Sequence, residues 1–300
     1  NVTQPFVDVT VDRRGVIAVD FDGDGIYDAS QDAPVPGVYA FQPGAPLADG
    51  LRIVAARLTP WAGSVVSATL PLTLDTTAPQ VASQALAFDG VNDYLSTPDL
   101  RSLFASATVT LELWFNANGP GVLASEISQA SPPNAGWHHD SHIEVLASGE
   151  VKVRVWNLTA VSLGTVTFGT WHHVALRYDS ATQVLDGFLD GIEAAGDSAG
   201  SRSWPSPLHY IFGAAETTNL GSGAWFDGVI DEIRIWNVAR SAEQIGLAWD
   251  AILTGTEPGL VAYYAFDAMS GTTAADATAN GRAATLGGGQ AASQPAANPN

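Results

Sequence analysis

The sequence predicts an all-β protein built from two sandwich modules, and three observations support that prediction. The chain holds 30 glycines and 17 prolines among its 300 residues, a composition that favours many turns. Short runs rich in Val, Thr, Trp and Phe alternate apolar and polar residues between those turns, which is typical of half-buried antiparallel strands. The chain is also too long for one small sandwich and suits two domains of about 100–200 residues each.

Four runs carry the alternation that predicts strands. In the run 172–178, Val174, Leu176 and Tyr178 fall on one face and the residues between them on the other, as a strand in a two-sheet sandwich requires. The four runs are VTLELWF (109–115), VKVRVW (151–156), HHVALRY (172–178) and IDEIRIW (230–236).

One helical stretch is predicted late in the chain, at SAEQIGLAWDAIL (241–253). Ser241 is suited to cap its N-terminus, because a serine side chain accepts hydrogen bonds from the free N–H groups of the first turn. One face of this predicted helix gathers four apolar residues, Ile245, Ala248, Trp249 and Ile252.

The segment LTLDTTAPQV (72–81) predicts the boundary between the two domains. The residues before Pro79 favour extended, non-helical backbone. Residues 287–300 consist almost entirely of small and polar residues with nothing to bury. We therefore predict a first module over residues 1–80, a larger sandwich over 81–286, and a flexible tail or linker over 287–300.

The charge balance narrows the classes of partner. The chain carries 31 acidic against 12 basic residues, a formal net charge of −19, which repels phosphate backbones and anionic lipid surfaces. We therefore expect neither nucleic acid as a partner nor insertion into a membrane. The acidity is compatible with simple solubility and also with carboxylates that collect divalent cations.

The absence of cysteine excludes disulfides, zinc–thiolate sites and cysteine nucleophiles. A secreted protein without disulfides needs another source of stability, and calcium bound only by the native state supplies one. No run of about 18 apolar residues appears, so we expect the chain to be soluble throughout.

The strongest chemical signal in the sequence is the run DFDGDGIYD (20–28). Four aspartates stand at loop positions one, three, five and nine with Gly25 at position six, which is the spacing of an EF-hand-type calcium loop. The tight turn at the glycine wraps the backbone around one hard cation, and the Ile26 carbonyl supplies a neutral oxygen. Position twelve holds Gln31 in place of the usual glutamate. The predicted calcium ligands are Asp20, Asp22, Asp24, Ile26, Asp28 and Asp32.

The flanks of this loop have the pattern of strands, VIAVD before it and GVYAF after it. We therefore expect a calcium-clamped hairpin loop in place of a helix pair. An exposed acidic turn without metal is the alternative.

The sequence around the loop resembles the bacterial immunoglobulin-like repeats of large surface adhesins. The resemblance rests on PLADG (46–50) before a strand and on DTTAP (75–79) at the end of the module. It covers most of residues 1–80 and implies a small immunoglobulin-like β-sandwich that acts as a spacer and is rigidified by calcium.

From about residue 84 the sequence resembles a laminin-G-like domain of the concanavalin-like jelly-roll superfamily. Three blocks carry this resemblance: ALAFDGVNDYLS (85–96), GTWHHVALRYDSATQVLDGFLDGIEA (169–194) and FDGVIDEIRIWNVARSAEQI (226–245). It implies a jelly-roll β-sandwich of a class that includes lectins.

This second resemblance also implies a structural cation near the turn of the first strand and the Ile-Asp-Glu strand. Carried over by motif, its ligands are Asp89 and Asn92 from FDGVND and Asp231 from VIDEI. A carboxylate at a strand end beside a glycine turn joins backbone carbonyls around a hard ion. The alternatives are that Asp89 caps its turn and that Asp231 accepts backbone hydrogen bonds.

Loops on the rigid sandwich are the expected place for ligand recognition. In GWHHDSHIEV (136–145), Trp137 is suited to stack on a sugar ring, and two further tryptophans are platform candidates. A transition-metal site from His138, Asp140 and His142 is a second possibility, with surface decoration as the alternative. The predicted ligand-binding residues are Trp137, His138, Asp140, His142, Trp204 and Trp225.

The jelly-roll superfamily includes glycoside hydrolases, which need two carboxylates across a cleft. The chain has no Glu-x-Asp-x-x-Glu run, phosphate loop or His-Glu-x-x-His helix. We therefore expect a non-catalytic, calcium-binding segment of a larger bacterial surface or secreted protein, located outside the cell or at its surface. Its expected role is adhesion or carbohydrate binding, with a glycan or cell-surface ligand as partner. A structural, protein–protein interaction module is the alternative, and a glycoside hydrolase is the least favoured reading.

Overall fold

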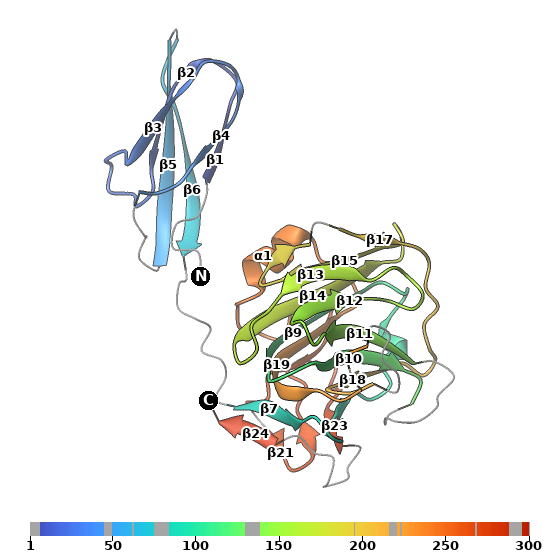
Figure 1. The fold of residues 1–300 in the computed structure, drawn as a ribbon. Helices are drawn as coiled ribbons and strands as arrows, with labels where there is room; N and C mark the ends of the chain where they lie inside the picture. Colours follow the sequence, from blue (N-terminus) through green and yellow to red (C-terminus); the bar gives the residue numbers. More distant parts are fainter. Residues whose placement is uncertain are drawn as a thin grey trace. The chain divides into compact units, whose positions relative to one another are not determined.

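The computed structural model divides the chain into two compact units. Unit 1 is Asn1–Gln80 and unit 2 is Val81–Asn300, and each is described by itself (Figure 1). None of the described helices is long and apolar enough to cross a membrane. The described residues are 7–44, 50–61, 63–74, 84–129, 139–194, 196–215, 221–222, 224–267, 269–287 and 296–299.

Unit 1 consists of two antiparallel sheets. Its strands are β1 (Val7–Val11), β2 (Gly15–Asp20), β3 (Ala29–Ala33), β4 (Gly37–Phe41), β5 (Gly50–Pro60) and β6 (Val66–Leu74). β1 and β4 form a 2-stranded sheet, and the order of the 4-stranded sheet is β3-β2-β5-β6. β2 and β3 form a hairpin, and their connection holds the acidic run 20–28.

The core of unit 1 gathers the inward-facing residues of β2 and its extension. Ile17, Val19 and Phe21 are fully buried, because alternate residues of a strand point to the same face. Val11 and Phe41 from the 2-stranded sheet pack in the same cluster. The acidic loop therefore starts directly from a buried, well-anchored strand.

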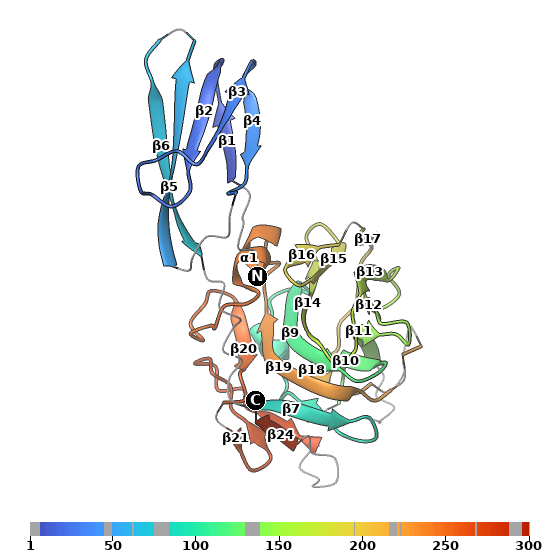
Figure 2. The same cartoon turned by 60° about the vertical axis from the view of Figure 1, so that its left-hand side comes forward.

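Unit 2 is a larger sandwich of two sheets, which we name sheet I and sheet II (Figures 1 and 2). Sheet I contains β7 (Gln84–Asp89), β9 (Val109–Ala117), β14 (Trp171–Asp179), β15 (Val184–Leu189), β16 (Ile192–Glu193), β17 (Ser198–Ala199), β19 (Asp227–Trp236), β20 (Leu260–Tyr264) and β24 (Ala296–Pro299). Sheet II contains β8 (Leu95–Ser96), β10 (Gly121–Ile127), β11 (His139–Val145), β12 (Glu150–Val153), β13 (Val161–Thr165), β18 (His209–Phe212), β21 (Met269–Ser270), β22 (Thr273–Ala274) and β23 (Ala284–Leu286). A 3-10 helix, η1 (Arg101–Leu103), and an α-helix, α1 (Ala242–Ala248), complete the described elements.

The strand order shows that segments far apart in sequence lie side by side. Sheet I runs β16-β15-β14-β9-β19-β7-β24, with β17 beside β15 and β20 beside β19. Sheet II runs β13-β12-β11-β10-β18-β8-β23-β22-β21. All of the pairs in both sheets are antiparallel among the described strands. The prediction of an all-β fold with sandwich-like sheets is confirmed.

The core of unit 2 lies between the two sheets. On β14, Val174, Leu176 and Tyr178 join the main apolar cluster, as the alternation of the sequence predicts. The opposite face of the same strand is covered by the helix, since Ala175 packs with Ile245 of α1. Sheet I is therefore buried on both faces where α1 lies.

Helix α1 is shorter than predicted. Ser241 caps it as expected, and Gln244 completes a capping box with the serine. The helix ends at Ala248, where the predicted helix would continue to residue 253. The guanidinium of Arg234 on β19 donates to the carbonyls of Ala248, Trp249 and Ala251. Those carbonyls are thereby satisfied without a further helical turn.

Part of the predicted tail is a strand. β24 pairs antiparallel with β7, with Ala296 opposite Ala87 and Pro299 opposite Gln84. The prediction for 287–300 is wrong at these residues, because a sheet edge is extended by backbone hydrogen bonds that need no apolar side chains.

Candidate functional site

The acidic loop of unit 1 is pre-organised by hydrogen bonds to its own backbone. Asp20, at the end of β2, accepts from the N–H groups of Gly23 at 2.7 Å and Gly25 at 2.9 Å. Asp28 closes the loop by accepting from the Phe21 N–H at 2.7 Å. Gly25 adopts φ +88°, a conformation that residues with a Cβ rarely take.

Three carboxylates converge in this loop. Asp20, Asp22 and Asp28 each offer an oxygen within 4.8 Å of the others. No ion pair joins these three to a basic side chain within the described residues, so their charge is not neutralised by the protein. A set of hard, anionic oxygens in one turn fits a hard divalent cation such as calcium.

The other predicted ligands of the loop lie outside this group of three. The Asp24 carboxylate accepts from the Ile26 N–H at 2.7 Å, and the Ile26 side chain is 69% exposed. Asp32 stands on β3 opposite Val16, with an exposed side chain. The structure therefore gathers three of the five predicted aspartate ligands.

The second predicted cation site is not assembled. Asp89 at the end of β7 pairs with Asp227, which is four residues before Asp231 on β19 and therefore roughly 13 Å from it along the strand. Asp89 instead accepts from the N–H groups of Val91 and Asn92 at 2.8 and 3.3 Å, which is the turn-capping alternative. The grouping of Asp89 and Asn92 with Asp231 is wrong because it ignored the register between β7 and β19.

Asp231 occupies an irregular stretch of β19. The register against β9 shifts between Asp231 and Arg234, and Glu232 adopts φ +51°, which is unusual for a residue with a side chain. Asp231 accepts from the Glu232 N–H, while its Oδ2 makes no hydrogen bond within the described residues. Burial, followed by the nearby charges of Glu232 and Asp267, raises the pKa of Asp231 to about 8.

The predicted ligand residues around β11 do not form a surface site. Trp137 and His138 lie outside the described residues. Asp140 is buried and its carboxylate accepts from the Trp156 N–H. His142 is completely buried, with its ring 6.1 Å from that of Tyr210. Asp140 Oδ2 lies 3.4 Å from His142 Nε2, so the structure brings two of the three residues of the predicted transition-metal site together. They lie in packed surroundings and not on the surface, and the metal site stays a prediction.

Both of the other predicted platforms make contacts within unit 2. Arg101 lies 3.8 Å over the ring of Trp204, and Phe104 packs edge-on against it at 5.7 Å. Trp225 is half-buried and packs in a cluster with Tyr94, among others. These contacts cover part of each ring, and the stacking role of the two tryptophans stays a prediction.

Trp156 is a partly exposed tryptophan that is not among the ligand-binding residues predicted from the sequence. This residue follows β12, is 41% exposed and adopts φ +50°. Its N–H is held by the buried carboxylate of Asp140. An unusual backbone conformation cannot be read from composition or alternation, so the sequence offered no signal for it.

The buried glutamate of β9 sits in a network under α1. Glu112 accepts a hydrogen bond from the Arg240 guanidinium at 2.6 Å. Its carboxylate also lies 3.4 Å from His173 and 3.8 Å from Arg234. Burial alone would raise the pKa of Glu112, but His173 and the two guanidiniums outweigh it and hold that pKa at about 2. Burial lowers the pKa of His173. The network ties β9, β14, β19 and the start of α1 together.

Three more glutamates of unit 2 are similarly engaged. Glu126 accepts hydrogen bonds from the Arg202 guanidinium at 2.9 Å and from the Tyr210 hydroxyl at 3.1 Å. Glu144 receives the Ser222 hydroxyl at 2.7 Å. Glu232 receives the Tyr263 hydroxyl at 2.6 Å and lies 3.2 Å from Arg234. These carboxylates hold the sandwich together.

A serine motif of unit 2 has no catalytic setting. The run GDSAG (196–200) has the spacing of a Gly-x-Ser-x-Gly nucleophile elbow. Ser198 lies instead in the short strand β17, opposite Leu185, and it is 7% exposed. The next described helix begins only at Ala242. The strand–turn–helix context that such an elbow requires is therefore not present here.

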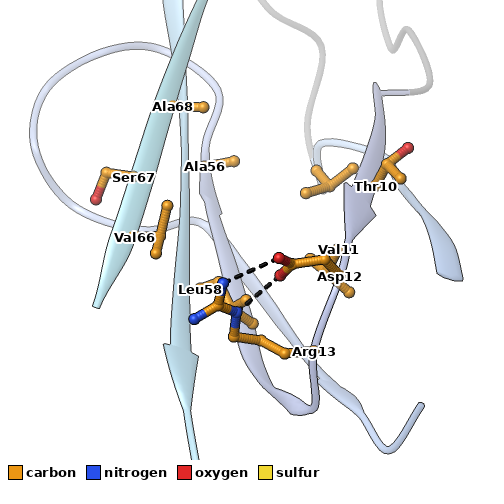
Figure 3. Close-up of a pocket in the computed structure, with 10 residues that line it drawn as sticks. Thr10, Val11, Asp12, Arg13, Ala56, Leu58, Val66, Ser67 and Ala68 are labelled. Atoms are coloured by element: carbon orange, nitrogen blue, oxygen red, sulfur yellow. Dashed lines mark hydrogen bonds and ion pairs between the residues drawn. The ribbon is translucent and has the colours of Figure 1, made fainter. Parts of the chain in front are cut away.

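Unit 1 also carries an open apolar groove of about 350 Å³. Figure 3 shows that Leu58 and Val66 line it from β5 and β6 and Val11 from β1. At its rim, the Arg13 guanidinium donates to both carboxylate oxygens of Asp12, at 2.8 and 2.9 Å. The lining is mostly apolar, which suits contact with another apolar surface.

Comparison with solved structures finds several of low similarity. A proposed carbohydrate-binding protein from Bacteroides ovatus is 17% identical, covers 94% of this chain and 90% of its own, and has a TM-score of 0.49. A heptameric SAP-like pentraxin from Limulus polyphemus is 13% identical, with coverages of 56% and 82% and a TM-score of 0.39. The CBM40 of a Ruminococcus gnavus IT-sialidase, bound to α2,3-sialyllactose, is 15% identical, with coverages of 55% and 98% and a TM-score of 0.39.

No curated protein sequence matches this chain. A laminin G family model, described as the Concanavalin A-like lectin/glucanases superfamily, matches residues 89–246. The match begins at the Asp89 turn, ends within α1 and covers more than half of the chain. The sandwich of sheets I and II agrees with that match. The chain therefore belongs to the Concanavalin A-like lectin/glucanases superfamily.

Proposed function

We propose that this chain is a non-catalytic, carbohydrate-binding segment of a larger extracellular or cell-surface protein, with a role in adhesion. The observation that carries the proposal is the membership of unit 2 in a superfamily of lectins and glucanases. Because fold alone does not fix function, the choice between lectin and glucanase rests on the side chains of the site.

The state of the carboxylates favours a binding role. A glycoside hydrolase needs two carboxyl groups facing each other across a cleft, one to give a proton and one to attack or activate water. Glu112, Glu126 and Glu232 instead bond to arginine or tyrosine side chains inside unit 2. Such engagement supports a structural task for them and leaves them unsuited to proton transfer at a substrate.

We further propose that unit 1 binds calcium through Asp20, Asp22 and Asp28 and acts as a rigid spacer of the immunoglobulin-like type. The convergence of three carboxylates supports the ion. A cation in this loop would link the end of β2 to the start of β3 and so stabilise the hairpin against opening.

The test is a glycan array probed with the whole chain, in calcium and in chelator, together with incubation on polysaccharides. We expect binding to at least one glycan and no release of reducing ends. Failure to bind any glycan would overturn the carbohydrate-binding role, and release of reducing ends would overturn the non-catalytic assignment.

A structural role through protein contacts is a second candidate, favoured by the apolar groove of Figure 3. Val65 and Val66 beside it are 55% and 50% exposed, and apolar surface of this kind is typical of interaction sites. Concentration-dependent assembly in sedimentation velocity would support it, while a monomer at all concentrations would remove self-assembly as the function.

A further inference from the structure

A polar groove of about 370 Å³ lies on unit 2, on the outer side of sheet I beside α1. The β14–β15 hairpin forms one wall, and the segment between β19 and α1 forms the other. Figure 2 shows α1 next to β16, which follows β15 in sheet I. Its polar lining residues are Arg177, Asp179, Thr182, Asp186, Arg240 and Ser241.

Arg177 forms the rigid floor of this groove. Its guanidinium donates to Asp186 Oδ2 at 2.8 and 3.0 Å and to Glu193 at 2.7 Å. It also donates to the carbonyl of Arg240 at 3.0 Å, which ties the two walls together. With these partners the arginine has little donor capacity left for a ligand.

The groups that remain available are acceptors. Asp186 Oδ1 makes no hydrogen bond within the described residues, while its Oδ2 is fixed by Arg177. Asp179 accepts from the Ala181 N–H and the Thr182 hydroxyl, and each of its oxygens keeps a further lone pair. Asp186 and Asp179 are diagonal neighbours across the β14–β15 pair, with Cα atoms about 7–8 Å apart.

This arrangement favours a ligand that donates hydrogen bonds and carries no charge. The carboxylates of Asp179 and Asp186 repel an anion, so a sugar acid is disfavoured. The guanidiniums of Arg177 and Arg240 in the same walls repel an ammonium group. Hydroxyl groups on two sides of one pyranose ring are neutral donors and span the distance between the two carboxylates.

We propose that this groove binds a neutral pyranose through Asp186 and Asp179. The proposal rests on the carbohydrate-binding function proposed above and names its site and its sugar class. The groove volume fits the size range of small-molecule sites. Because the Arg177 contacts hold Asp186 in place without a ligand, little ordering cost accompanies binding.

The test measures binding of the whole chain to methyl glycosides of glucose, galactose, mannose, fucose and N-acetylglucosamine, with 3′-sialyllactose for comparison. We expect a neutral glycoside to bind. Asp186→Asn and Asp179→Asn should each weaken it by about tenfold or more, since a hydrogen bond to a charged acceptor is lost. Glu193→Gln is the matched control, because Glu193 contacts the same Arg177 from outside the groove lining, and it should leave affinity within about twofold.

Asp179→Asn keeps the test decisive if Asp186→Asn disturbs folding, because Asp179 has no ion pair to lose among the described residues. Glycoside binding that is unchanged in both variants would overturn this site while leaving the carbohydrate-binding function intact. Selective binding of the sialylated sugar would overturn the neutral class. Absence of binding to every sugar, on the array as well, would overturn both proposals.

Discussion

In unit 1, Asp20, Asp22 and Asp28 lie together in a loop and bond to backbone N–H groups, whereas in unit 2 the buried Glu112 and Glu126 bond to arginines. The two regions thus treat negative charge in opposite ways. Backbone N–H groups orient a carboxylate but leave its charge in place. Glu112 and Glu126 are buried, and the guanidinium bonded to each cancels its charge, so these two carboxylates become part of the framework.

The difference teaches which acids of this protein are available for chemistry. Carboxylates that lie close together and keep their charge attract a cation, and without a cation they repel each other. Paired carboxylates in a dry interior are costly to disturb, because removing one partner leaves the other charge buried. Substitutions in the two regions should therefore differ in effect, and the largest loss of stability should come from the buried pairs.

Glu112→Gln should destabilise unit 2 by about 3–5 kcal/mol, because it leaves Arg240 buried without its counter-charge. Urea denaturation followed by tryptophan fluorescence measures the loss. Glu150→Gln is the control: its partner Lys152 lies 3.1 Å away but both side chains are partly exposed, so its effect should stay below about 0.5 kcal/mol. Equal effects of the two substitutions would contradict the role assigned to the buried network.

Calcium should stabilise unit 1 by about 2.7 kcal/mol when the ion is at about a hundred times its Kd. The measurement is the thermal unfolding of the whole chain in calcium and in chelator. Asp20→Asn should remove the rise in unfolding temperature that calcium causes, whatever its effect on the unfolding temperature in chelator.

Asp24→Asn is the matched control for this loop, since Asp24 lies outside the converging group. This variant should keep a rise in unfolding temperature when calcium is added. If both variants lose that rise equally, the ion is held by the full spacing motif and not by the group of three.

Much of this fold was predictable because its signals are local. Alternation placed Val174, Leu176 and Tyr178 on the core face of β14 without knowledge of any partner strand. The acidic spacing of the run 20–28 likewise depends on a turn within a few residues, so three of its carboxylates meet as the spacing implies.

The predictions that the structure contradicts depended on contacts between segments far apart in the sequence. Asp231 and Asp89 looked like partners, but the pairing of Asp89 with Asp227 separates them. Helix α1 ends early because Arg234, from a strand, takes its last carbonyls. The Arg101 guanidinium over the ring of Trp204 is likewise a contact that the sequence pattern does not contain. Register and side-chain partners of this kind are fixed by tertiary structure, which a single sequence pattern does not contain.

Asp231 differs from Glu112 and Glu126, since it is buried and no basic side chain bonds to it within the described residues. Its pKa is raised to about 8, so the native carboxyl keeps a proton that the unfolded chain releases above a pH of about 4. The free energy of unfolding should therefore fall as the pH rises from about 4 to about 8.

Asp231→Asn should remove this pH dependence and, in chelator at pH 8, stabilise unit 2 by about 1–2 kcal/mol, because an amide carries no charge to bury. Denaturant titrations at several pH values measure it. A loss of stability in calcium only would show that Asp231 binds a cation, and an unchanged pH slope would contradict the assigned protonation.

The smallest effect should come from Ser241→Ala, which removes a neutral cap. Ser241 accepts from the Gln244 N–H at 3.1 Å, and the Gln244 side chain accepts from the Ser241 N–H at 2.9 Å. Its loss should cost about 1 kcal/mol, the usual value for a helix N-cap. Chemical denaturation of Ser241→Ala, Gln244→Ala and the double variant measures the coupling of the box. If Ser241→Ala cost as much as Glu112→Gln, then α1 would be anchored mainly by its own cap, and the arginine network beneath it would be of minor weight.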